Sequence, residues 1–181
     1  MKAFLDACVL YPTVLREVLL GVAGAGLYRP LWSPRVLEEW ARAARKVAGG
    51  EAVARGEIAA LRARWPDAEV RPGEATMARM WLPDPHDVHV LAAASDAGAD
   101  VLVTLNVRDF PRGEVAAEEM RLQPPDAFLM DLWLGAPEAV AAAVERVRAE
   151  AERLSGEPQP VRALLRRARL PRLGKAIDGD G

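Results

Sequence analysis

The chain has 181 residues, of which 51% are apolar and 28% are charged, and its formal net charge is −2. This balance is typical of a folded soluble protein and excludes both a disordered chain and a polycation that binds nucleic acid through its overall charge. The single cysteine, Cys8, excludes an intrachain disulfide. Because the N-terminus has no apolar signal segment and no stretch approaches the ~18 apolar residues of a membrane span, we expect a cytoplasmic protein that makes no use of a membrane.

Short apolar runs in the N-terminal two thirds of the chain predict the strands of a parallel sheet. Residues 3–5 and 101–104 are the clearest, because apolar side chains fill them without alternation. Weaker candidates are residues 28–32, 68–70 and 120–122. The exits of the two clear strands carry the polar residues Asp6, Thr104, Asn106 and Asp109. An alternative for Asp6 is that it caps a helix beginning near Pro12.

Apolar residues at helical spacing alternate with these strands, which favours an α/β fold. Ser33 and Pro34 are a typical helix start, and Gly49-Gly50 breaks the helix that follows. Gly135-Ala-Pro137 is the best domain boundary, giving units 1–135 and 136–181, and the last residues, Ile177 to Gly181, are expected to be frayed. The predicted helices cover residues 12–24, 34–48, 51–65, 74–81, 87–98, 124–134, 138–154 and 161–170.

Acidic residues on the predicted helices are candidates for a site, although each has a structural explanation as well. Glu38 and Glu39 lie on either side of the apolar face of their helix, and Glu39 is closer to its edge. Both could be solvated surface charges. Asp84 and Asp87 precede a nearly all-apolar helix, where acids are favoured by capping and by the helix dipole. One Asp would satisfy that explanation, but two aspartates with His86 and His89 exceed it.

The carboxyl ends of parallel strands form the usual site of an open α/β sheet. Asp6 and Asp109 follow the two clear strands, and Asp87 begins the helix that leads into the second. Several carboxylates close together repel one another unless a cation compensates. Hard oxygen ligands without cysteine favour Mg²⁺ or Mn²⁺ over Zn²⁺. The residues therefore predict metal-assisted hydrolysis of a phosphodiester.

Other chemistries fit the sequence less well. No Gly-rich phosphate loop is present, and a phosphoaspartyl phosphatase of the haloacid-dehalogenase type would have Asp at the position of Cys8. The pair His86 and His89 could bind Zn²⁺ or act in acid–base chemistry, but the chain has no third histidine. Cys8 is interpreted as a small buried residue near Asp6.

The C-terminal segment is basic. Residues 158–175 carry six basic side chains and no acidic one. A solvated helix face and a surface that contacts phosphates explain this equally well. The candidates for RNA contact are Arg162, Arg166, Arg167 and Arg169.

Four segments in order resemble the PIN-domain ribonucleases, in particular the VapC-like toxins of toxin–antitoxin pairs. They are Phe4–Val9, Ser33–Trp40, Asp84–Asp87 with the Ala-rich helix that follows, and Val103–Pro111. The resemblance covers roughly residues 2–135, and residues 136–181 resemble the helical extension of one branch of the family. It implies a three-layer α/β/α fold with a central parallel sheet of four to five strands.

The resemblance also implies an activity and partners: a Mg²⁺- or Mn²⁺-dependent endoribonuclease that uses a metal-activated water, a type II toxin, a homodimer and a small cognate antitoxin. The family's catalytic acids carry over to Asp6, Glu39 and Asp87, with Asp84 as a neighbour that assists. Many members have Asp where this chain has Asn106, so Asp109 is the expected fourth carboxylate and metal ligand. Thr104 and Asn106 would support the site.

Two other functions fit the same residues. One is a metal-dependent phosphoesterase that acts on DNA or on a small phosphate ester. The other is a non-catalytic PIN-like module that binds RNA or regulates, which the uncharged Asn106 makes plausible.

Overall fold

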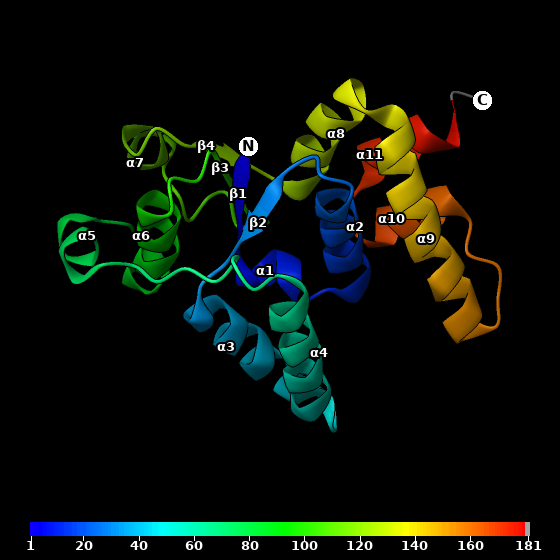
Figure 1. Cartoon of the computed structure of the whole chain (residues 1–181), viewed down its shortest axis with the longest axis horizontal. Helices are drawn as coiled ribbons and strands as arrows, with labels where there is room; N and C mark the ends of the chain where they lie inside the picture. Colours follow the sequence, from blue (N-terminus) through cyan, green and yellow to red (C-terminus); the bar gives the residue numbers. More distant parts are fainter. Residues whose placement is uncertain (180–181) are drawn as a thin grey trace. The chain divides into compact units, whose positions relative to one another are not determined.

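The fold is built on one parallel sheet of four short strands (Figure 1). A computed structural model describes residues 1–179 of the chain. The strand order is β2-β1-β3-β4, and every pairing is parallel. This confirms the predicted α/β class and its three-layer α/β/α, PIN-like arrangement, with four strands. The strands are β1 (Lys2–Leu5), β2 (Arg29–Leu31), β3 (Val101–Val103) and β4 (Arg121–Gln123).

The two central strands lie side by side in a register that fixes the site. Leu5 of β1 is the partner of Val103 of β3, so the residues that follow them, Asp6 and Thr104, leave the sheet at the same level. The backbone N–H of Asp6 donates to the carbonyl of Val103 at 3.2 Å, which extends the pairing by one residue. β1 and β3 are almost wholly buried, as expected for strands that are apolar on both faces.

Contacts divide the chain into two compact units, and the sheet belongs to the first, residues 1–11 and 29–123. In Figure 1 the helices α5, α6 and α7 of this unit lie to the left of its strands, and α3 and α4 lie below them. The two largest buried side chains of the chain are Trp32 and Trp40. The helices of this unit are α1 (Ala7–Leu10), α3 (Pro34–Ala43), η1 (Ala44–Lys46), α4 (Gly50–Arg64), α5 (Glu74–Arg79), η2 (Pro85–Asp87), α6 (Val88–Asp96) and α7 (Arg112–Ala117).

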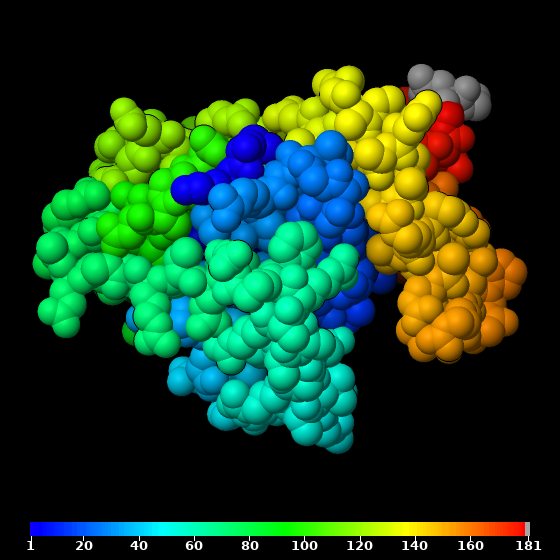
Figure 2. Space-filling model, viewed as in Figure 1, coloured from blue at the N-terminus to red at the C-terminus, as the bar shows by residue number. Residues whose placement is uncertain are grey.

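The second unit, residues 12–28 and 124–179, is helical. Its helices α2 and α9 pack closely, because a Cβ on Gly21 would lie 3.4 Å from the Cβ of Ala143. Tyr28 meets Phe128 edge-to-face at 5.0 Å. Figure 2 shows α9 on the surface of this unit, where most of its charged residues are exposed. The helices are α2 (Thr13–Gly24), α8 (Pro125–Gly135), α9 (Pro137–Ser155), α10 (Val161–Arg167) and α11 (Pro171–Asp178). The boundary between residues 135 and 136 stays a prediction.

Several local expectations were wrong. Residues 68–70 form no strand, and only an isolated parallel bridge joins Trp32 to Glu69. Ile177 was expected to be frayed but belongs to α11. The carboxylate of Asp126 binds the first backbone N–H groups of this helix, and its Leu173 is fully buried, so both features hold the helix in place. The expectation of fraying at residues 180 and 181 lies outside the described residues. The helices α1, α7 and α11 were not predicted from the sequence. Within residues 1–179, no helix combines the length and the apolar character needed to cross a bilayer.

Candidate active site

Asp6 and Thr104 meet at the carboxyl ends of β1 and β3. The hydroxyl of Thr104 donates to Oδ2 of Asp6 at 2.7 Å, and both side chains are buried. This hydroxyl also accepts a hydrogen bond from the backbone N–H of Asn106 at 3.0 Å. Thr104 therefore orients the Asp6 carboxylate and fixes the turn after β3 at the same time.

Asp6 is held by two further donors. Its Oδ1 accepts from the backbone N–H of Ala7 at 2.6 Å, and its Oδ2 accepts from Sγ of Cys8 at 3.0 Å. The contact with Ala7 caps α1, whereas α2 begins only at Thr13, so the alternative in which Asp6 caps a helix beginning near Pro12 is wrong. A carboxylate offers about four lone-pair sites. Three donors leave about one of them for a ligand.

Cys8 serves this arrangement as a protonated thiol. Burial raises the pKa of the Cys8 thiol to about 12, and the charge of Asp6 adds to the effect. Its sulfur also accepts from the backbone N–H of Leu105 at 3.2 Å. Because the nucleophilic form of cysteine is the thiolate, these surroundings make Cys8 a poor nucleophile.

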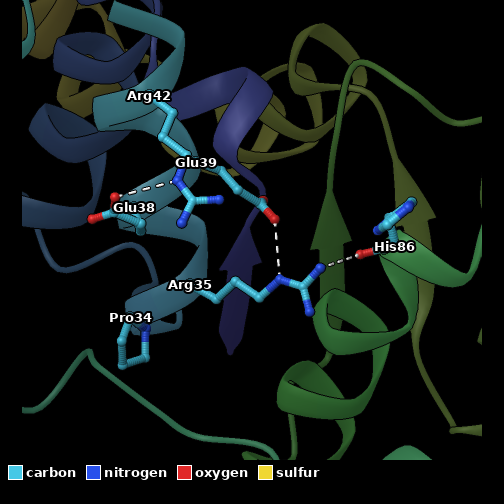
Figure 3. Close-up of a pocket in the computed structure, with 6 residues that line it drawn as sticks. All are labelled: Pro34, Arg35, Glu38, Glu39, Arg42 and His86. Atoms are coloured by element: carbon cyan, nitrogen blue, oxygen red, sulfur yellow. Dashed lines mark hydrogen bonds and ion pairs between the residues drawn. The ribbon is translucent and has the colours of Figure 1, made fainter.

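Glu39 enters the site from α3, which Ser33 starts by accepting a hydrogen bond from the backbone N–H of Val36. Its Oε1 lies 2.9 Å from Nε2 of the buried His89, and Nε of Arg35 donates to the same oxygen at 3.3 Å (Figure 3). Burial raises the pKa of the Glu39 carboxyl, but His89 and Arg35 outweigh burial and hold it below its usual value. Its other oxygen has no partner among the described residues.

Asp84 and Asp87 have different roles although they are close in the sequence. Asp84 caps η2, because its Oδ1 accepts from the backbone N–H of His86 at 2.9 Å. Asp87 stands at the N-cap position of α6 but makes no capping hydrogen bond. Helix capping therefore accounts for an acid at position 84, whereas it does not account for the acid at position 87.

The pKa of Asp87 is influenced by other acids of the predicted site. Burial is the largest cause of the raised pKa of Asp87, which reaches about 6. The other causes that raise it are the negative charges of Asp6, Asp84 and Asp109. His89 lowers it, so this histidine lies near both Asp87 and Glu39.

Asn106 and Asp109 lie in the turn that follows β3. The backbone N–H of Asp109 donates to the carbonyl of Asn106 at 3.0 Å. Asn106 is exposed and Asp109 is half-buried. Of these two residues only Asp109 carries a charge, and that charge is among the causes that raise the pKa of Asp87.

Two family models match the chain. The model of the PIN domain matches residues 2–108, more than half of the sequence. The chain belongs to the PIN-domain family. A model of the VapC50 C-terminal domain matches residues 125–178, so the resemblance to a VapC-like PIN protein with a C-terminal extension is confirmed. Searches of curated proteins and of solved structures find no match.

The matched PIN segment contains most of the predicted site. Asp109 lies one residue beyond its end, so the family match does not cover the expected fourth carboxylate. The match does cover the Thr104 turn and Asn106. The other predicted site residues inside it are Asp6, Glu39, Asp84 and Asp87.

The donors of this PIN domain fit a hard divalent cation in chemistry. Carboxylates that repel one another at a sheet edge are what such an ion stabilises. Within residues 1–179, however, no three His, Cys, Asp or Glu side chains lie close enough together to hold an ion. Asp6, Glu39 and Asp84 are each held by donors of the protein itself. The candidate ligands therefore do not surround a common point within the described residues.

The two histidines have different surroundings, which does not favour a shared zinc site. His86 is exposed and lines a pocket, whereas His89 is buried with its Nε2 2.9 Å from Oε1 of Glu39. The sequence did not reveal the contacts of His89 or Arg35 with Glu39. The spacing of Arg35 and Glu39, four residues apart on one helix, was the one available signal.

The six basic residues of the C-terminal segment, residues 158–175, are exposed. Arg167 donates to Oε1 of Gln159 at 2.7 Å. The four candidates for RNA contact, Arg162, Arg166, Arg167 and Arg169, all lie on the surface of α10 or directly after it.

Proposed function

We propose that this chain is a metal-dependent endoribonuclease and the toxin of a type II toxin–antitoxin pair. The observation that carries the proposal is that the buried pair Asp6 and Thr104 meets at the carboxyl edge of the sheet, at 2.7 Å, inside the segment that the PIN-domain model matches. The negative charges of Asp6, Asp84 and Asp109, which raise the pKa of Asp87, support it. The PIN-domain match supports a nuclease activity, and such a cluster of acids would suit a divalent cation. Mg²⁺ and Mn²⁺ are the ions that these ligands favour.

The residues of the site would divide the work. Asp6, Asp87, Asp109 and the free oxygen of Glu39 would hold the ion. Thr104 fixes the carboxylate of Asp6 by its 2.7 Å hydrogen bond. When bound, a divalent cation lowers the pKa of a water molecule and screens the charge of a phosphodiester.

The supporting residues have smaller tasks. Asn106 would contribute an amide oxygen without charge, and Asp84 would assist from its capping position on η2. In the second unit, the exposed Arg162, Arg166, Arg167 and Arg169 would contact the RNA backbone. Their contribution would fall as salt is added, because it is electrostatic.

The test compares two aspartates and two glutamates of the sheet-bearing unit. Asp6→Asn, Asp87→Asn and Glu39→Gln are expected to lose cleavage of single-stranded RNA in Mg²⁺ by at least about a hundredfold. Glu69→Gln is the matched control, because Glu69 is a glutamate of the same unit that pairs with Arg62. Glu69→Gln should keep the wild-type rate. Wild-type cleavage by Asp6→Asn would refute the proposal.

The same assay separates the substrate classes. Single-stranded RNA, single-stranded DNA and a generic phosphomonoester are offered to the wild-type protein at equal concentration. Cleavage of RNA alone supports the proposal, whereas cleavage of DNA or of the monoester supports a phosphoesterase of another kind.

A second candidate is a non-catalytic PIN-like module that binds RNA or regulates. The exposed, uncharged Asn106 and the absence of a closed three-ligand group within residues 1–179 favour it. Calorimetric titration with Mn²⁺ decides between the two. Binding that is lost in Asp87→Asn supports the enzyme, and no binding at millimolar metal supports the module.

The biological part of the proposal has its own tests. The VapC50 C-terminal domain match supports a cognate small antitoxin, and we propose that the toxin acts in the cytoplasm. Expression of the chain alone should arrest growth, and Asp6→Asn should relieve the arrest. A small DNA-binding protein encoded next door should restore growth when it is expressed together with the chain. Sedimentation equilibrium would test the proposed homodimer.

A further inference from the structure

A pocket of about 700 Å³ opens beside Glu39 in the sheet-bearing unit (Figure 3). Two elements distant in sequence, α3 and η2, form its walls. It contains two guanidinium groups, those of Arg35 and Arg42, and the two carboxylates of Glu38 and Glu39, so its charges balance, unlike those of the acids next to it. The lining residues are Pro34, Arg35, Glu38, Glu39, Arg42 and His86.

Arg35 spans this pocket from α3 to η2. Its Nε donates to Oε1 of Glu39 at 3.3 Å, and its Nη2 donates to the backbone carbonyl of His86 at 3.3 Å. Figure 3 shows the side chain stretched between these two partners. A guanidinium has five N–H donors, so three remain, including both on Nη1. The two bonds hold the group in place while the remaining donors stay available.

Arg42 is committed to another task. Its Nε donates to Oε1 of Glu38, which also pairs with Arg55. It lies seven residues after Arg35, about 10 Å farther along α3. Its side chain is also the more exposed of the two. Arg35 is therefore the cation of this pocket that is fixed next to Glu39.

An RNA backbone that approaches the acidic residues of the candidate site is repelled by their negative charges. The negative charges of Asp6, Asp84 and Asp109 already raise the pKa of Asp87. A divalent cation that neutralises only the reacting phosphate leaves the negative charges of the neighbouring RNA phosphates without a partner. Arginine binds phosphate through parallel N–H donors, which gives orientation as well as charge.

We propose that Arg35 binds the RNA phosphate next to the one that is cleaved, in the pocket between α3 and η2. The inference rests on the proposed function and adds a substrate contact to it. Through this contact Arg35 places the backbone of single-stranded RNA along Glu39. Its hydrogen bonds to Glu39 and His86 orient the guanidinium before the RNA arrives.

The test measures RNA binding separately from cleavage. The full chain carrying Asp6→Asn is the parent, and binding of a short fluorescent single-stranded RNA is followed by anisotropy without divalent metal, at salt from about 50 to 200 mM. Arg35→Ala is expected to weaken binding about tenfold at low salt. It should also reduce the slope of log K against log salt by about 0.7, the value for one phosphate contact on a single strand.

Two further variants keep the result specific. Arg35→Lys retains the charge but not the paired donors, so it should keep the slope and lose about threefold in affinity. Arg62→Ala is the matched control, because Arg62 is an exposed arginine of the same unit that pairs with Glu69 outside the pocket. It should leave both affinity and slope unchanged. Arg35 is half exposed, and thermal unfolding would verify that each variant folds.

The outcomes separate this inference from the proposed function. An Arg35→Ala slope equal to that of the parent, or an equal loss in Arg62→Ala, overturns the inference even if the wild-type chain cleaves RNA. A parent that does not bind RNA overturns it as well. A slope that depends on Arg35, in a chain that fails to cleave RNA in Mg²⁺, supports Arg35 as an RNA phosphate contact, overturns the nuclease, and with it overturns the placement of that phosphate next to a cleaved one.

Discussion

Thr104 donates its hydroxyl hydrogen to Oδ2 of Asp6 at 2.7 Å, across the two central strands of the sheet. The two residues are 98 positions apart in the sequence. Both side chains are buried, so the bond is shielded from water. The position of the Asp6 carboxylate is thus part of the packing of the sheet, and its perturbation should show in both stability and activity.

Thr104→Val keeps the shape of this side chain and removes its hydroxyl. We expect a loss of about 1–3 kcal/mol in the free energy of unfolding, because buried Oδ2 of Asp6 loses a donor and the N–H of Asn106 loses its acceptor. Urea denaturation measures the loss, and RNA cleavage should fall with it. Thr104→Ser keeps the hydroxyl and should retain most of both. Equal stability of Thr104→Val and the wild type would contradict this role.

The raised pKa of Asp87 predicts how stability depends on pH in the absence of divalent metal. Its folded pKa, about 6, lies above its ordinary value of 3.8, so the native state binds the proton more tightly than the unfolded state. The free energy of unfolding should therefore fall as pH rises from about 4 through about 6, and stay lower above that. Asp87→Asn should remove the contribution of this carboxyl to the pH dependence of the free energy of unfolding.

The size of this effect is limited by solvent. Asp87 is only half-buried, so we expect Asp87→Asn to be more stable than the wild type by about 1 kcal/mol near pH 7, with the difference vanishing towards pH 4. Urea denaturation at several pH values measures it. Glu38→Gln is the control for loss of a carboxylate elsewhere. A wild-type chain that gains stability relative to Asp87→Asn as pH rises would contradict the prediction.

His89 keeps Glu39 charged. With Nε2 2.9 Å from Oε1 of Glu39, it offsets the burial that would otherwise raise the pKa of Glu39. His89→Leu should therefore raise the pKa of the Glu39 carboxyl, which carbon-13 NMR titration follows directly. Arg35→Ala should raise it less, because Arg35 acts through a longer and more exposed contact. An unchanged titration of Glu39 in His89→Leu would exclude this interaction.

Asp126 joins the first turn of α8 to the start of α11 in the helical unit. Its carboxylate accepts from the backbone N–H groups of Arg172 and Leu173, both at 3.1 Å. Asp126→Ala should cost about 1 kcal/mol, the usual value of a lost helix cap. Hydrogen exchange of the first amides of α11 should accelerate. Asp126→Asn, which keeps one acceptor oxygen, should show a smaller change; no difference between the two would point away from capping.

The strands and the long helices could be predicted because their signals are local. The apolar runs before Asp6 and Thr104 led to β1 and β3, and Ser33-Pro34 gave the start of α3. The helix α1 has only four residues, too few for a periodic pattern. The helix α11 was missed because its cap comes from Asp126, 46 residues earlier than Arg172.

Within the site, the sequence could nominate residues but not their partners. It pointed to Asp84 and Asp87 together, and only the structure separates the capping residue from the one without a capping bond. The contact of His89 with Glu39 joins two helices whose relative rotation has no signature in the sequence. The site residues themselves stay predictions until the variants are measured.

The distance in sequence between Asp6 and Thr104 has a consequence during synthesis. A growing chain that ends before β3 contains Asp6 but lacks the strand that pairs with β1 and the hydroxyl that orients the carboxylate. Asp109 is added later still. On the ribosome, the proposed nuclease would therefore stay inert until more than half of it has been translated, which separates the production of the chain in time from its activity.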